Sequence, residues 1–246
     1  MQVYTPKPRE RAMEQIEAYI LQNGLKAGDS LPPEREMCRM WDLNRSTLRS
    51  AIARLEASGR LVSVQGSGTR LTPRFRRTLQ DLHSFTEYAR DGGFRPETRL
   101  LSFSKVECDK HLSRRFRRVL GERFYRIARL RMLDGMPVLL ETAFIPEDLA
   151  PGLEQHDLVS GSLFAVLRQA YGLELDHGEE KASITLATEE EAALLEIAPG
   201  APVFWIVSQT DAPDGTVIEY CRTVGRADRM ELASILRWQG EEESHG

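Results

Sequence analysis

The chain has 246 residues, with 33 Lys and Arg against 37 Asp and Glu, and 41% of its residues are hydrophobic. This length favours two domains, and the composition is that of a globular protein, which excludes a disordered or fibrous chain. Because no run of about 18 apolar residues is present and residues 1–10 lack the apolar core of a secretory signal, we expect a cytoplasmic protein without a membrane segment.

Charge is distributed unevenly along the chain. Residues 1–78 carry 2 Lys and 12 Arg against 8 Asp and Glu, a formal charge of +6, and the remainder carries −10. A basic head before an acidic body is typical of a protein whose head meets a polyanion, although a solvated arginine-rich surface would give the same count. Charge alone does not distinguish a polyanion-binding head from a solvated surface. The order of the residues along the chain is the further evidence.

The head is predicted to contain three helices and a hairpin. Apolar residues at helical spacing indicate a helix over 9–23, and a second helix begins at the prolines and glutamates of 31–36. Asn44 is a good N-cap for a third helix, which runs from about Arg45 to Ser58. Two β-like runs, 61–64 and 69–71, flank a glycine-rich tip. Three helices followed by a two-stranded hairpin predict a winged helix-turn-helix.

The polar side of the third helix carries the candidate DNA contacts. Polar residues gather in its first turns, which are the turns that touch base edges in the major groove. Arginine can make a bidentate contact to guanine, and Ser or Thr can reach bases or phosphates. Each feature alone has an ordinary explanation, such as a solvated arginine or a simple turn, but their ordered combination favours DNA binding. The candidate DNA-binding residues are Arg35, Arg45, Ser46, Thr47, Arg49 and, at the hairpin tip, Gly66.

The stretch from Gly28 to Leu71 resembles a known family. Its segments GDSLPPEREM, LNRSTLRSAIARLEASGRL and QGSGT are similar to the DNA-binding head of GntR-family bacterial transcription regulators. The resemblance implies that this head binds a double-stranded DNA operator, with Arg35, Arg45, Thr47, Arg49 and Gly66 as the main contacts.

The body is predicted to be an antiparallel α+β domain. Ser84 with Glu87 and Thr188 with Glu191 are capping boxes that begin helices, Asp109 caps another, and 162–171 reads as an amphipathic helix. The dipeptides Asp-Gly at 134–135 and 214–215 predict hairpin turns. Strands are expected at 98–107, 124–133, 136–145, 180–186, 203–209 and 217–224. Alternating elements of this kind fit helices packed on one sheet.

Arg129 and Arg131 lie two residues apart on one predicted strand and therefore share a face of the sheet. With Glu141 on the partner strand, they could clamp a phosphate or carboxylate. The alternative is an exposed polar face with Arg–Glu cross-strand pairs, each contributing about 0.2–1 kcal/mol. Spacing alone favours the alternative.

A second resemblance covers residues 79–237. The segments SFT, GGFRP, RLRMLDGMPVLLETAFIP, SLF and IEY are similar to the UTRA effector-binding domain of HutC-type regulators. This likeness implies a chorismate-lyase-like fold in which a small anionic effector, such as a sugar phosphate, lies over the sheet. Arginines and serines would hold the anionic group, and glutamates would hold hydroxyls or an amine. The implied effector-binding residues are Ser84, Arg129, Arg131, Glu141, Ser162 and Glu219.

The expected organisation is a winged helix-turn-helix at 1–72, a linker at 73–82, an effector-binding and dimerisation domain at 83–238 and an acidic tail at 239–246. We expect a homodimeric repressor that its effector releases from a pseudo-palindromic operator. Two alternatives stay open, namely that the lyase-like body is an enzyme or that it only dimerises. No nucleophile–base constellation is present, the five histidines are scattered and the three cysteines are isolated, so no catalytic residue, metal or cofactor is expected.

Overall fold

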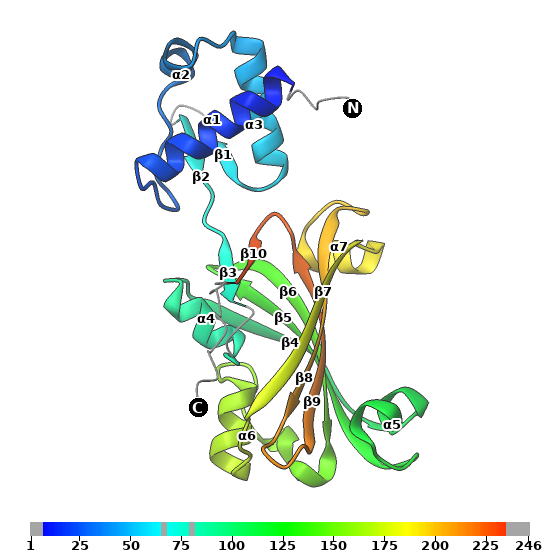
Figure 1. Cartoon of the computed structure of the whole chain (residues 1–246). Helices are drawn as coiled ribbons and strands as arrows, with labels where there is room; N and C mark the ends of the chain where they lie inside the picture. Colours follow the sequence, from blue (N-terminus) through cyan, green and yellow to red (C-terminus); the bar gives the residue numbers. More distant parts are fainter. Residues whose placement is uncertain (1–6, 65–67, 79–81, 235–246) are drawn as a thin grey trace, which may run out of the picture. The chain divides into compact units, whose positions relative to one another are not determined.

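The computed structural model describes residues 7–64, 68–78 and 82–234. The chain forms two compact units (Figure 1), one made of Met1–Phe75 with Arg226–Met230 and the other of the remaining residues. We call the first unit the head and the second the body. Within the described ranges, no helix is long and apolar enough to cross a membrane.

The head is a winged helix-turn-helix, as the sequence predicts. Its elements are α1 (Pro8–Gln22), α2 (Glu34–Met40), α3 (Arg45–Ala57), β1 (Leu61–Val64) and β2 (Gly68–Leu71). The strands β1 and β2 pair antiparallel, with Leu61 opposite Leu71. The tip of this hairpin, residues 65–67, lies outside the described residues.

The head core forms where the apolar stripe of α3 meets α1 and α2. Residues of all three helices are buried there, namely Ala12, Ile16, Ile20, Met37, Leu48, Ala51, Ile52 and Leu55. Met40, which the periodicity of the second helix places in the core, is instead 47% exposed. Trp41, the residue after α2, is half-buried and packs edge-on against Tyr19 of α1, with ring centroids 6.0 Å apart.

The body contains a six-stranded sheet in the order β4-β5-β6-β9-β8-β7. The strands are β4 (Pro96–Glu107), β5 (Arg123–Leu133), β6 (Met136–Pro146), β7 (His177–Leu186), β8 (Pro202–Asp211) and β9 (Val217–Arg226). Two short strands, β3 (Phe75–Thr78) and β10 (Met230–Ala233), pair separately. This is the α+β architecture that the sequence predicts, although β7 begins three residues earlier than expected.

The Asp134-Gly135 turn forms the hairpin that the sequence predicts. Asp134 has φ 50° and Gly135 has φ 79°, and Leu133 pairs with Met136 across the turn. Positive φ at both central residues is the requirement of a tight hairpin turn whose twist matches the strands. Beyond the turn, a register shift between Arg131 and Met132 places Leu139 opposite Arg131 and Glu141 opposite Arg129.

Helices cover both faces of the body sheet. They are α4 (Phe85–Asp91), α5 (Lys110–Phe116), α6 (Leu163–Tyr171) and α7 (Glu189–Leu195), with two 3-10 turns at Glu147–Leu149 and Leu153–Gln155. On one face α6 packs onto Tyr125 and Ile127, whereas α5 and α7 pack on the other face against Phe124 and Leu130. Since side chains alternate along β5, Arg129 and Arg131 project from the α6 face.

Candidate nucleic-acid interface and buried polar cluster

The first turn of α3 is shaped by its N-cap. Asn44 Oδ1 accepts hydrogen bonds from the Thr47 backbone N–H and from the Ser46 hydroxyl, both at 2.8 Å. An Asn at this position satisfies an amide of the first turn that has no partner inside the helix. The predicted cap is confirmed, and it holds Ser46 and Thr47 at the exposed start of the helix.

The candidate DNA contacts lie on the solvent side of the head. Arg35 on α2 and Arg45, Ser46 and Arg49 on α3 are exposed, and Thr47 is half-buried. The buried stripe of α3 occupies the opposite side, so the polar residues form one accessible edge. Gly66 lies outside the described residues.

Arg49 is tied to the preceding helix. Its Nε donates to Glu34 Oε2 at 2.8 Å, while 69% of the Arg49 side chain stays exposed. An exposed ion pair contributes little stability, about 0.2–1 kcal/mol. The ion pair instead affects the orientation of Arg49, because it restricts the guanidinium to one side of the α2–α3 pair. Such a pre-oriented arginine suits bidentate recognition of a base edge.

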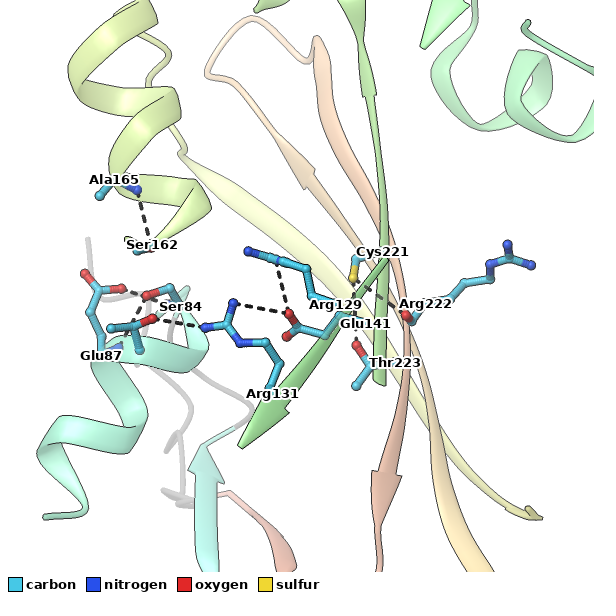
Figure 2. Close-up of polar contacts among 11 residues, drawn as sticks. Ser84, Glu87, Arg129, Arg131, Glu141, Ser162, Ala165, Cys221, Arg222 and Thr223 are labelled. Atoms are coloured by element: carbon cyan, nitrogen blue, oxygen red, sulfur yellow. Dashed lines mark hydrogen bonds and ion pairs between the residues drawn. The ribbon is translucent and has the colours of Figure 1, made fainter. Parts of the chain in front are cut away.

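In the body, Arg129 and Arg131 form a buried cluster with Glu141. The two arginines are 5% and 2% exposed. Arg129 pairs with Glu141 at 3.1 Å and Arg131 lies 3.7 Å from the same carboxylate (Figure 2). We call these three residues the arginine cluster. The exposed polar face that spacing alone favours is therefore wrong, because α4 covers this part of the sheet.

Helix α4 supplies contacts that the sequence reasoning missed. Arg131 Nη2 donates to Thr86 Oγ1 at 3.0 Å, and the guanidinium carbon lies 4.4 Å from the centroid of the Phe85 ring. Both residues directly follow Ser84, the predicted N-cap. Their position in the first turn after the predicted cap is the sequence signal that could have identified them. Side chains of a first turn lie close to the residues that the start of the helix contacts.

Ser84 and Ser162 begin the two helices on the arginine side of the sheet (Figure 2). Ser84 forms the predicted capping box with Glu87, in which the Ser84 N–H donates to Glu87 Oε2 at 2.7 Å. The hydroxyl of Ser162 accepts from the Ala165 N–H at 3.4 Å. The arginine side chains extend in the direction of these helix starts (Figure 2). The structure thus gathers five of the six predicted effector residues on one face, namely Ser84, Arg129, Arg131, Glu141 and Ser162.

Several hydrogen-bond donors of the arginine cluster have no partner among the described residues. Arg129 Nε and Nη1 and Arg131 Nε are buried and lack a hydrogen-bond partner within the described part of the chain. Burial also lowers the pKa of Arg131 to about 10, against the opposing charge of Glu141. An unsatisfied buried donor costs about 1–3 kcal/mol, and more when it is charged. An anion placed among these nitrogens would remove that cost.

Glu219 on β9 lies in the same electrostatic environment. It is 5% exposed, and burial raises its pKa to about 7, with the charge of Arg129 opposing the rise and that of Glu141 adding to it. Glu219 is therefore poised between its neutral and ionised forms near neutral pH. No group of three or more His, Cys, Asp or Glu side chains in the described ranges is arranged to hold a metal ion.

Two family descriptions match the chain, one for each unit. Residues 8–71 match "Bacterial regulatory proteins, gntR family", and residues 91–231 match "UTRA domain". The chain is 30% identical to the transcriptional repressor NagR of Bacillus subtilis, over 91% of this chain and 92% of NagR. It is 28% identical to the mannosyl-D-glycerate transport/metabolism system repressor MngR of Escherichia coli, over 94% and 97%.

A solved structure shows the same architecture. The crystal structure of PhnF from Mycobacterium smegmatis matches with a TM-score of 0.68 and 27% identity, over 92% of this chain and 99% of that chain. The effector domain of PhnF alone matches with a TM-score of 0.63, over 66% of this chain and 99% of that chain. The likeness therefore extends over both units.

Proposed function

This chain belongs to the GntR family of bacterial regulatory proteins, with a UTRA domain as its body, and we propose that it is a dimeric repressor released from its operator by a small anionic metabolite. The family consists of transcription regulators, and the chain is not an enzyme. The names of NagR and MngR as repressors support repression here.

We propose that the start of α3 reads the operator. The exposed Arg45 and Arg49 and the half-buried Thr47 would enter the major groove, where each bidentate arginine contact to guanine discriminates by about 1–3 kcal/mol. Arg35 would contact the adjacent backbone, and Gly66 would approach the minor groove. The formal charge of +6 on residues 1–78 supports a further, sequence-independent attraction that weakens with salt.

The observation that carries the effector proposal is the set of unpartnered donors on Arg129 and Arg131. Three buried guanidinium nitrogens without a partner among the described residues fit a phosphate or carboxylate, which accepts charge-assisted hydrogen bonds. Ser84 and Ser162 would add hydroxyl donors, and Glu141 and Glu219 would accept from hydroxyls or an amine. The name of MngR, which refers to mannosyl-D-glycerate, supports a sugar-derived ligand.

The exposed strand β7 supports a dimer. Two large apolar side chains on it, Ile184 and Leu186, are 71% and 65% exposed. Exposed apolar side chains on an edge strand are an opportunity for pairing with another chain. A second copy placed along β7 would cover them, and a two-fold axis would present two heads to half-sites about one helical turn apart.

The proposal is tested by selecting binding sites for the full chain from random duplexes and footprinting the enriched sequence. A protected patch with two-fold symmetry that persists at about 150 mM salt is the expected result. Enrichment of no sequence, with binding that disappears as salt rises, would overturn the regulator proposal.

A further inference from the structure

Arg77 connects the segment that leaves the head with the far edge of the body sheet. It lies in β3, two residues after Phe75, the last residue of the long head segment. Its guanidinium Nη2 forms an ion pair with Glu180 Oε2 on the edge strand β7. The two side chains are only 22% and 16% exposed, whereas the neighbouring Arg76 faces solvent. The connecting strand, which also pairs with β10, is thus joined to β7 by a largely buried ion pair.

Only one oxygen of the Glu180 carboxylate, Oε2, takes part in this ion pair. Its other oxygen, Oε1, is buried and accepts no hydrogen bond from any described residue. Burial raises the pKa of Glu180, and the charge of Arg77 opposes that rise. A buried acceptor without a donor is unfavourable, because it has lost its hydrogen bonds to water. A hydroxyl or ammonium group on a ligand would satisfy it.

Arg77 also acts on the acid at the centre of the body. Its positive charge lowers the pKa of Glu219 against the effect of burial, as does that of Arg129. Arg77 therefore influences the charge of Glu219, one of the proposed effector residues, while belonging to the strand that continues from the head.

We propose that Glu180 contacts the effector through Oε1 and that the Arg77–Glu180 pair reports its presence to the connecting strand. A ligand donor at Oε1 draws negative charge away from Oε2 and competes with Arg77, so an occupied site loosens β3. This inference rests on the proposed function for the existence of an anionic effector. It adds two residues to that site, with separate roles in contact and in coupling.

The contact role is tested with Glu180→Gln in the full chain, using inorganic phosphate and a panel of hexose 6-phosphates with and without a 2-amino group. Thermal shift and calorimetry should show wild-type binding of inorganic phosphate, because the arginines are intact. Binding of the tightest hexose phosphate should weaken by about 10-fold or more, as expected for loss of a hydrogen bond to a charged group. Equal weakening of both ligands, no weakening of either, or no hexose phosphate that binds the wild type more tightly than phosphate would overturn the contact.

The coupling role is tested with Arg77→Gln, and Arg76→Gln is the matched control on the same strand. Without ligand, Arg77→Gln should bind a selected operator about 5-fold or more weakly, since allosteric couplings are typically of this size, and ligand should add little further loss. It should still bind inorganic phosphate, and Arg76→Gln should behave as the wild type. Equal operator binding by the two variants would overturn the coupling. Failure of the wild type to bind phosphate would instead contradict the effector proposal itself.

Discussion

Arg129 lies directly opposite Glu141 in the β5–β6 register, and its Nη2 donates to Glu141 Oε2 at 3.1 Å. Arg131 approaches the same carboxylate at 3.7 Å from two residues along the strand. Two guanidiniums thus share one carboxylate, and the remaining donors are buried. This imbalance explains why a site of this composition would favour an anion, since a second negative group would complete the hydrogen bonding.

Replacing either arginine should remove anion binding. We expect Arg129→Gln and Arg131→Gln to lose the stabilisation that inorganic phosphate gives the wild type, because ligand stabilisation follows binding to the folded state. The measurement is the melting temperature across a phosphate titration at constant ionic strength. Arg126→Gln, on the same strand and with the opposite parity, is the control and should respond as the wild type. A phosphate response in Arg131→Gln equal to that of the wild type would contradict the site.

The two ends of α3 should differ in their effect on DNA recognition. Arg49→Ala should reduce the preference for operator over random DNA by about 5- to 150-fold, the equivalent of about 1–3 kcal/mol for one bidentate contact. Arg54→Ala, an exposed arginine in the last turn of the same helix, should weaken binding to both DNAs alike. Fluorescence anisotropy with the two duplexes measures the ratio. An unchanged ratio in Arg49→Ala would show that this residue does not read bases.

Glu219 should make stability fall as pH rises. Burial raises its pKa from 4.5 to about 7, so the native state keeps a proton that the unfolded chain releases. Between about pH 5 and pH 8 the wild type should therefore lose up to about 3 kcal/mol relative to Glu219→Gln, which has no such proton. Urea denaturation of both proteins across this range gives the difference. A difference independent of pH would mean that Glu219 titrates near its ordinary pKa.

The proposed dimer should depend on the exposed edge of β7. We expect Ile184→Asp, alone or with Leu186→Asp, to shift the full chain toward monomers in sedimentation velocity, because a charge would have to be buried in the pairing surface. Val119→Asp is the matched control, since Val119 and Ile184 are both 71% exposed. If the Ile184→Asp protein remains dimeric at low micromolar concentration, the dimer uses another surface.

Local sequence signals predicted most of the fold. The caps at Asn44, Ser84 and Thr188 and the turn at Asp134-Gly135 depend on contacts within three or four residues, so they can be recognised without tertiary information. The register that places Glu141 opposite Arg129 depends in addition on an irregularity between Arg131 and Met132, which the turn alone does not predict. These features determined which residues share a face of the body sheet.

Burial and contacts between residues far apart in the sequence depend on tertiary packing and could not be predicted from local sequence. Alternation places Arg129 and Arg131 on one face, but it predicts neither their burial nor the contacts of Arg131 with Phe85 and Thr86 of α4, which needed the structure. The Arg77–Glu180 pair joins residues 103 positions apart and has no local signature.

The central claim is that the anion site of the body controls DNA binding by the head. Its most direct test is operator affinity of the full chain with and without the phosphorylated ligand that most stabilises the wild type, at matched ionic strength. We predict that saturating ligand weakens operator binding of the wild type by about 5-fold or more and leaves Arg131→Gln unchanged. Equal operator affinity of the wild type with and without saturating ligand would contradict the account.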